Sequence, residues 1–154
     1  MRKVFHFDAQ RENYICDAAV IWCFDNRFTV TGRKFLKQIG VLNYDSIRIA
    51  GGAKSLVSPD HESDREFVFR QIRTSMRIHQ TKRVILMLHS DCRTYGGLAE
   101  AFGGDARLEE QRLSGELQRA ADCLRREVPG LDVQTYFANF EGVWEVEAVP
   151  GISS

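Results

Sequence analysis

The sequence predicts an α/β fold, in which helices flank a parallel sheet on both faces. Two apolar runs of strand length, residues 18–23 and 84–88, are each followed by polar residues, which is typical of strands buried on both faces. Segments with apolar residues at helical spacing separate the expected strands. Because alternating strands and helices form right-handed crossover units, the strands are expected to run parallel.

The first half of the chain is expected to form two strands, each followed by a helix. Residues 18–23 form the first strand, and a short helix covers about residues 31–39, where Gly40 is suited to end it. Residues 46–50 alternate briefly and predict the second strand. A longer helix is expected over about residues 60–79. Its predicted inner face consists of Phe67, Val68, Ile72, Met76 and Ile78.

The second half begins with the buried strand at residues 84–88. A charged amphipathic stretch predicts a helix over about residues 106–127, which a Pro-Gly pair then ends. Residues 133–138 predict another strand, whereas residues 142–149 alternate apolar and acidic positions, which favours an additional edge strand near the C-terminus. The predicted inner face of the 106–127 helix consists of Leu108, Leu113, Leu117, Ala120, Ala121 and Leu124.

Composition favours a single globular domain over residues 1–154. The chain is 44% hydrophobic and 27% charged, and it shows no repeat, low-complexity tract or linker. Its 21 Lys and Arg residues balance 21 Asp and Glu residues. No global positive field therefore favours nucleic acid or an anionic membrane as a partner, and a local basic patch stays open.

The lack of a recognisable targeting signal and the cysteine content favour the cytoplasm. The apolar stretches are far shorter than the roughly 20 residues that span a bilayer, and residues 1–8 lack the apolar core of a secretory signal. The four cysteines are expected to be free thiols or metal ligands, because a chain of this size needs no disulfide staples. Cys16 and Cys123 lack a strand-end context and are expected to be ordinary thiols.

Two compact motifs follow the expected buried strands. Cys23, Asp25 and Arg27 place a thiol, a carboxylate and a guanidinium within five residues, where the first strand ends. His89 and Cys92 follow the 84–88 strand in the pattern His-x-x-Cys. Ligands of open α/β sheets bind at the carboxyl ends of the strands, so both motifs lie where a site is expected.

The two motifs together suit a metal ion. If the chain crosses back after the second strand, the first and third strands become neighbours and their ends meet. Adjacent strands lie about 4.8 Å apart, and two thiolates on one zinc ion are separated by roughly 4 Å. Cys23, Cys92 and His89 then offer two thiolates and one imidazole, which suit Zn²⁺ and leave a fourth position for water.

A structural interpretation of the same residues stays open. In that alternative, Cys23 and Cys92 are ordinary buried cysteines and His89 is a hydrogen-bonded core histidine. Asp25 and Arg27 then form only a local salt bridge. The pairing of both motifs at equivalent strand ends favours the metal site. The glycines at positions 51 and 52 either form a simple turn or let the backbone approach a site that a Cβ would obstruct.

At these positions the sequence resembles the β-class carbonic anhydrases, together with the related carbonyl sulfide and carbon disulfide hydrolases. The family pattern is Cys-x-Asp-Ser-Arg, then an Ala-Gly turn, then His-x-x-Cys, and the matching pieces occur here in that order. The resemblance extends over about residues 18–149, because residues 141–146 are similar to the last strand of the family. It implies a parallel sheet of order 2-1-3-4 and a homodimer or higher homo-oligomer.

The resemblance also implies a role for each motif residue. Cys23, His89 and Cys92 would ligate Zn²⁺, and Asp25 paired with Arg27 would face the fourth coordination position. Asp25 either orients water there or binds the metal itself, and its pairing with Arg27 favours the ionised carboxylate. The implied activity is the reversible hydration of carbon dioxide to bicarbonate. The alternatives are hydrolysis of carbonyl sulfide or carbon disulfide, and a non-catalytic zinc-binding relative.

Three departures from the family pattern bear on activity. Asn26 replaces the usual serine, and Arg93 with Thr94 replaces the glycine that usually follows the second cysteine. The segment before Cys23 is also too short for the long helical arm of many members. Arg93 brings bulk and a permanent charge that can gate the pocket, bind an anion or obstruct the site. His61 is the candidate proton shuttle.

Overall fold

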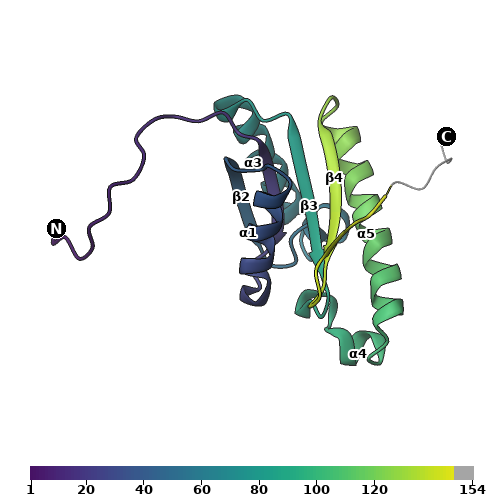
Figure 1. Ribbon diagram of the computed structural model, residues 1–154. Coiled ribbons are helices and arrows are strands. Elements are labelled where there is room, and N and C mark those ends of the chain that lie inside the picture. Colours follow the sequence, from purple (N-terminus) through teal and green to yellow (C-terminus); the bar gives the residue numbers. More distant parts are fainter. Residues whose placement is uncertain (148–154) are drawn as a thin grey trace.

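The chain forms a five-stranded sheet in a computed structural model that describes residues 1–147 (Figure 1). The strand order is β2-β1-β3-β4-β5, in which the first four strands are parallel and β5 is antiparallel to β4. The strands are β1 (Ala18–Cys23), β2 (Tyr44–Ile49), β3 (Arg83–His89), β4 (Asp132–Ala138) and β5 (Val143–Glu145). The predicted α/β class and the order 2-1-3-4 with an additional edge strand are confirmed.

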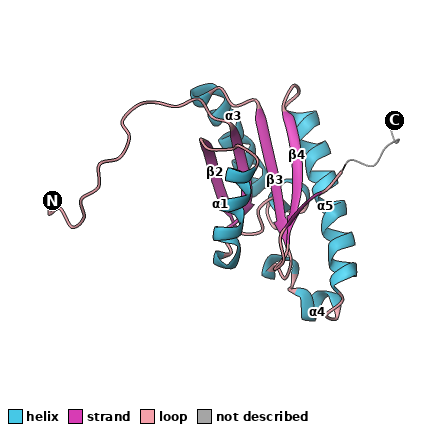
Figure 2. Ribbon diagram, in the orientation of Figure 1, coloured by secondary structure: helices cyan, strands magenta, loops and turns pink. Residues whose placement is uncertain are grey.

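Helices cover both faces of the sheet (Figure 2). The α-helices are α1 (Thr29–Gln38), α2 (Lys54–Val57), α3 (Glu62–His79), α4 (Leu98–Phe102) and α5 (Ala106–Glu127), and the 3-10 turns are η1 (Asn26–Phe28) and η2 (Arg93–Tyr95). On one face, Leu36 of α1 packs with Trp22 of β1. On the other, α2, α3 and α5 contribute Leu56, Ile72 and Leu117 to a larger core cluster.

β1 lies inside the sheet between β2 and β3, and all six of its residues are buried. Val20 and Trp22 belong to the cluster under α1, whereas Ala19 and Ile21 belong to the cluster on the opposite face. This burial on both faces is the reason for the continuous apolar run in the sequence. The register pairs Ile21 with Leu86 of β3, so β1 and β3 end at the same edge of the sheet.

Three residues predicted on inner helix faces are exposed. Phe67 and Ile78 of α3 are 43% and 54% exposed, whereas Val68 is buried. Leu108 of α5 is 49% exposed, and its neighbour Glu109 is buried instead. The reason is the helical period: consecutive residues point about 100° apart, since one turn holds 3.6 residues. Val68 and Glu109 face the core, so the residues before them point outward.

The predicted element boundaries differ from the structure by a few residues. α1 begins at Thr29 rather than at residue 31, and the short helices α2 and α4 were not predicted. β5 ends at Glu145, and positions 148 and 149 of the predicted edge strand lie outside the described residues. Within residues 1–147, no helix is both long and apolar enough to cross a membrane.

The segment before β1 contains no helix, and its first part extends away from the sheet (Figure 1). Tyr14 fixes the end of this segment to the amino end of the sheet. Its hydroxyl donates to Asp45 Oδ1 at 2.5 Å, and its ring lies 4.2 Å from that of His79. The segment therefore follows the expectation that it forms no long helical arm.

Candidate metal centre

Three side chains from the two sequence motifs converge at the carboxyl ends of β1 and β3. Cys23 is the last residue of β1, His89 is the last residue of β3, and Cys92 follows on the loop to η2. Their ligand atoms all lie within 4.8 Å of one another, and all three residues are buried. The predicted meeting of the first and third strands therefore brings the predicted residues together.

Two glycines allow the backbone to close over this cluster. Gly51 and Gly52 have positive φ angles of 77° and 54°. A Cβ on Gly52 would lie 2.7 Å from the backbone nitrogen of Cys23 and 2.8 Å from the carbonyl oxygen of Met87. No side chain fits there without moving backbone. The structure therefore shows both roles considered for these glycines, since they form a turn and also allow the close approach of backbone.

His89 presents one ring nitrogen toward the cluster and keeps the other occupied. Its Nδ1 lies 2.7 Å from the carbonyl oxygen of Ser90, which fixes the ring orientation. Its Nε2 is buried and has no hydrogen-bond partner among the described residues. Buried polar atoms are normally satisfied, and metal-ligating histidines characteristically hold the distal nitrogen by a hydrogen bond. The free Nε2 beside two thiols therefore fits a metal ligand.

The two thiols differ in their electrostatic environment. The Cys92 thiol, the neighbouring His89 imidazole and the backbone N–H groups of Asp25 and Gly51 stabilise the Cys23 thiolate and lower its pKa to about 4. The hydrogen bond between Cys92 and Cys23, together with burial, raises the pKa of Cys92. Without a metal the two thiols therefore titrate as a pair that shares one proton. A thiolate of this kind is a ready metal ligand.

Asp25 and Arg27 form a tight ion pair beside the cluster. Arg27 donates to Asp25 from its backbone N–H at 3.0 Å, from Nε at 3.1 Å and from Nη2 at 2.7 Å. These hydrogen bonds lower the pKa of Asp25 to about 2. Asp25 Oδ2 lies 3.9 Å from the free Nε2 of His89. An ionised carboxylate is thus held at the edge of the cluster, and it lies outside the set of three converging ligand atoms.

Arg48 and Thr94 contact the cluster, although no role was predicted for Arg48 and Thr94 was noted only as a departure from the family pattern. Arg48 of β2 donates to the carbonyl oxygens of Cys23 at 3.1 Å and Asp25 at 3.0 Å, so it holds the turn after β1. Thr94 Oγ1 lies 3.0 Å from Cys92 Sγ. Arg48 lies in a segment whose alternating pattern predicts only a strand. Its contact with the turn after β1 becomes visible only once the strand order is known.

Arg93 and His61 are both exposed. The Arg93 side chain runs beside Gly97, since a Cβ on that glycine would lie 3.4 Å from Arg93 Cδ. Its charge contributes to lowering the pKa of Asp91, after the hydrogen bonds from Leu98 and Arg27. His61 precedes α3 without a capping hydrogen bond from its side chain. The predicted effects of Arg93 on access and of His61 on proton transfer stay predictions.

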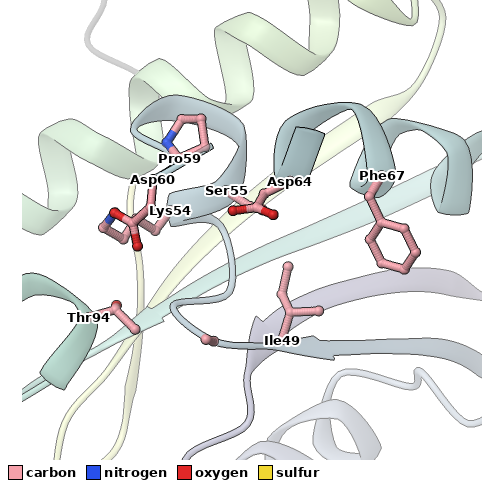
Figure 3. Close-up of a pocket in the computed structure, with 9 residues that line it drawn as sticks. Ile49, Lys54, Ser55, Pro59, Asp60, Asp64, Phe67 and Thr94 are labelled. Carbon is pink, nitrogen blue, oxygen red and sulfur yellow. The ribbon is translucent and has the colours of Figure 1, made fainter. Parts of the chain in front are cut away.

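One hollow borders the cluster, and a second lies near it. A small cavity of about 20 Å³ is lined by Cys23 and His89 together with apolar side chains, including Phe28, Met87 and Ala138. A larger hollow of about 200 Å³ lies beyond Thr94 (Figure 3). Its lining comprises Ile49, Ala50, Lys54, Ser55, Pro59, Asp60, Asp64, Phe67 and Thr94. The small cavity is thus apolar and touches two candidate ligands, whereas the larger one is charged.

Comparison with known proteins assigns a family to this fold and site. Residues 15–150 match the family model described as "Putative carbonic anhydrase". The chain belongs to this carbonic anhydrase family. A similar solved structure is the β-carbonic anhydrase isoform I of Trichomonas vaginalis, with a TM-score of 0.61 and 11% identity over 93% of this chain and 88% of that one.

Two further solved structures share the fold. One of the structures of tetrameric β-carbonic anhydrases from Sordaria macrospora gives a TM-score of 0.60 and 17% identity, covering 88% of this chain and 83% of that one. The metal-free form of a carbon disulfide hydrolase gives a TM-score of 0.54 and 14% identity, covering 88% of this chain and 82% of that one. The predicted resemblance to β-class carbonic anhydrases and related hydrolases is therefore confirmed at the level of family and fold.

Proposed function

We propose that this carbonic anhydrase family member catalyses the reversible hydration of carbon dioxide to bicarbonate at a Zn²⁺ centre held by Cys23, His89 and Cys92. The observation that carries the proposal is the buried convergence of these three side chains with His89 Nε2 left without a partner. Two thiolates and one imidazole form a known donor set of catalytic zinc sites, in which the fourth position stays open. When bound, zinc would supply a Lewis acid that makes water nucleophilic near neutral pH.

Asp25 and Arg27 are proposed to orient the attacking water. Because Arg27 keeps Asp25 ionised, the carboxylate can accept a hydrogen bond from water and cannot donate one. The four hydrogen bonds from Arg27 also restrict the carboxylate to one orientation. This supports an orienting role for Asp25 over that of a fourth ligand, since Arg27 already engages both carboxylate oxygens.

The small apolar cavity is proposed to hold the carbon dioxide molecule. Its volume of about 20 Å³ is somewhat above the roughly 10–15 Å³ that one water molecule needs. Phe28 and Met87 line it with apolar surface, which suits a linear molecule without a net dipole, and the Cys23 and His89 walls bring that molecule next to the metal ligands. Carbonyl sulfide and carbon disulfide are the alternative substrates, because both are linear, although sulfur makes them larger and carbonyl sulfide carries a small dipole.

Assembly and location complete the proposal. A homodimer or higher homo-oligomer is proposed, because solved structures of similar fold include tetrameric β-carbonic anhydrases and because apolar side chains near the site are exposed, among them Phe24 at 63% and Phe140 at 64%. Light scattering of the purified chain would test it, and a mass of 17.6 kDa would contradict it. The four free thiols suit the reducing cytoplasm.

Stopped-flow measurement of carbon dioxide hydration with a pH indicator tests the function. Zinc-loaded protein is expected to accelerate hydration, and the same protein after chelation is expected to lose that acceleration. Zinc analysis of both samples shows whether the site was filled. A filled protein with no rate above background at neutral and alkaline pH would contradict the proposal, and sulfide release from carbonyl sulfide would then identify the alternative substrate class.

A further inference from the structure

The loop between His89 and Cys92 is held by a carboxylate from a distant helix. Glu109 of α5 is 1% exposed. One of its oxygens accepts a hydrogen bond from the Ser90 hydroxyl at 2.6 Å, and the other accepts from the backbone N–H of Asp91 at 2.6 Å. Glu109 therefore contacts both residues that separate the two candidate ligands.

A carboxylate in this position destabilises the fold unless its partners compensate. Burying a charged group is unfavourable when no cation or hydrogen bonds accompany it. Within residues 1–147, no Lys or Arg lies at ion-pair distance from Glu109, so its described compensation comes from the loop itself. A leucine or methionine would fill the same helical position without that requirement, so packing alone does not explain a glutamate there.

The loop adopts a backbone conformation that needs such support. Asp91 has a φ of 56°, the left-handed region that residues with a Cβ rarely adopt. Besides Glu109, the backbone N–H of Leu98 donates to Asp91 Oδ1 at 2.8 Å, and Arg27 donates to Asp91 Oδ2 at 2.9 Å and to its carbonyl oxygen at 3.1 Å. Contacts from α5, α4 and the Asp25–Arg27 turn thus converge on one strained residue.

The hydrogen bonds connect this loop to both halves of the site. The carbonyl oxygen of Ser90 accepts the contact from His89 Nδ1 that turns Nε2 toward the cluster. Asp91 holds Arg27, which in turn holds Asp25. A displacement of the loop would therefore change the spacing of the two ligands and the support of Arg27.

We propose that Glu109 is a positioning residue of the metal centre, which sets the loop between His89 and Cys92 and thereby the affinity of the site for Zn²⁺. This role rests on the proposed metal centre and does not depend on which substrate the centre uses. Glu109 touches no candidate ligand directly and acts through Ser90 and Asp91. Residues of this kind typically alter metal affinity about 10- to 100-fold when they are changed.

The test is the substitution Glu109→Gln, read by Zn²⁺ affinity in competition with a chelator and by the visible spectrum of the Co²⁺-loaded protein. Glutamine keeps the size of the side chain, loses the charge and replaces one acceptor oxygen with an NH2 donor. The hydrogen bond with the Ser90 hydroxyl must therefore reverse its direction, and neither bond to the loop is charge-assisted any longer. The expected result is a roughly 10- to 100-fold weaker affinity and an altered cobalt spectrum, which reports the ligand geometry.

Glu116→Gln is the matched control. Glu116 lies on the same helix, is 4% exposed, and accepts hydrogen bonds from Ser58, Arg119 and, at 3.4 Å, the Tyr95 hydroxyl of η2, but none from the loop between the ligands. Glu116→Gln is expected to lower the melting temperature as Glu109→Gln does. Its Zn²⁺ affinity and its Co²⁺ spectrum are expected to stay unchanged. Wild-type affinity and spectrum in Glu109→Gln, or an equal change in both variants, would overturn the proposal.

Ser90→Ala keeps the proposal testable if Glu109→Gln does not fold, as judged by circular dichroism. It removes one of the two hydrogen bonds and leaves Glu109 in place, so a weaker Zn²⁺ affinity is expected and an unchanged one would overturn the proposal. Failure of the proposed function can be distinguished from failure of the proposed role of Glu109. A wild-type protein that binds no zinc rejects the centre itself, whereas one that binds zinc without hydration rejects only the reaction.

Discussion

The two ends of the sheet each place a histidine beside a carboxylate, but in the described chain only the carboxyl end leaves a histidine with a buried nitrogen that has no hydrogen-bond partner. At the amino end, His79 Nδ1 lies 2.8 Å from Asp45 Oδ2. At the carboxyl end, His89 Nε2 is buried without a hydrogen-bond partner in the described chain, 3.9 Å from Asp25. The difference separates a group of side chains that stabilises the fold from the group that is proposed to bind a metal ion.

The amino-end cluster, defined as Tyr14, Asp45, Ser75 and His79, is closed. Asp45 accepts hydrogen bonds from the hydroxyls of Tyr14 at 2.5 Å and Ser75 at 2.6 Å, in addition to its contact with His79. Burial alone would raise the pKa of Asp45, but the hydrogen bonds from Ser75, Tyr14 and His79 outweigh it and lower the pKa. The cluster joins the N-terminal segment, β2 and α3. This structural role accounts for the arrangement of its four side chains, so no ligand is needed to explain it.

Removing a ligand at the carboxyl end should produce the largest effect. Cys92→Ala leaves the cluster with Cys23 and His89 alone, so zinc affinity is expected to fall by more than about 100-fold, since changes outside the ligand set already cost roughly 10- to 100-fold. Zinc-dependent hydration should disappear with it. Cys16→Ala is the control, because Cys16 is equally buried but belongs to no ligand cluster. Full zinc content in Cys92→Ala would contradict the assignment of Cys92 as a metal ligand.

The next effect is expected from the backbone that closes over the carboxyl end. Gly52→Ala requires a positive φ and places a Cβ 2.7 Å from backbone, so it should lower the free energy of unfolding by about 2–5 kcal/mol. Gly40→Ala has a similar φ of 79° but no atom within 4 Å of the new Cβ, so it should cost only about 1–2 kcal/mol. Urea unfolding measures both, and equal losses would show that packing against Cys23 contributes nothing.

Asp25→Asn should separate metal binding from catalysis at the carboxyl end. The amide cannot carry the charge that Arg27 stabilises, so the hydration rate is expected to fall about 100-fold, or about 2.7 kcal/mol in activation free energy. Zinc affinity should stay within a few-fold of the wild type, because Asp25 lies outside the three-ligand cluster. A large loss of zinc with unchanged turnover per bound metal would identify Asp25 as a ligand instead.

The smallest effect is expected at the amino end. Asp45→Asn removes a charged acceptor from Tyr14 and Ser75 and should lower the free energy of unfolding by about 1–3 kcal/mol near neutral pH. Because the folded pKa of Asp45 lies below the unfolded value of about 3.9, its stabilisation is complete above that value and is lost as pH falls through the folded pKa. The stability difference between the variant and wild type should therefore shrink below about pH 4.

Urea unfolding from about pH 3 to pH 7 measures this dependence. Zinc affinity of Asp45→Asn should match the wild type, because the substitution lies at the opposite end of the sheet. A stability difference that stays constant at low pH would show that the charge of Asp45 is not what stabilises the cluster.

The parts of the fold that were predictable follow from periodicity and strand order. The runs that became β1 and β3 are buried on both faces, so their apolar residues are continuous and their ends are visible in the sequence. Cys23, His89 and Cys92 stand at those ends, and the adjacency of the two strands was sufficient to bring them together. The apolar runs and the short motifs at their ends were therefore sufficient to predict the central part of the site.

The residues that support the site were not predictable in this way. Glu109 occupies a buried position that its apolar neighbour Leu108 was expected to fill, and its reason for facing inward is a pair of partners 18 and 19 positions earlier in the chain. Asp91 carries no sequence signal for its positive φ. The contact of His79 with Asp45 depends on how α3 ends beside β2. Each of these positions is decided by tertiary contacts.

X-ray absorption at the zinc edge of the zinc-loaded wild-type protein tests the central claim most directly, because it counts the atoms bound to the metal. The account predicts one zinc ion per chain with two sulfur ligands, one imidazole nitrogen and a further light atom. A zinc shell without sulfur, or a protein that retains no zinc after desalting, would contradict the assignment of Cys23, His89 and Cys92 as the metal centre.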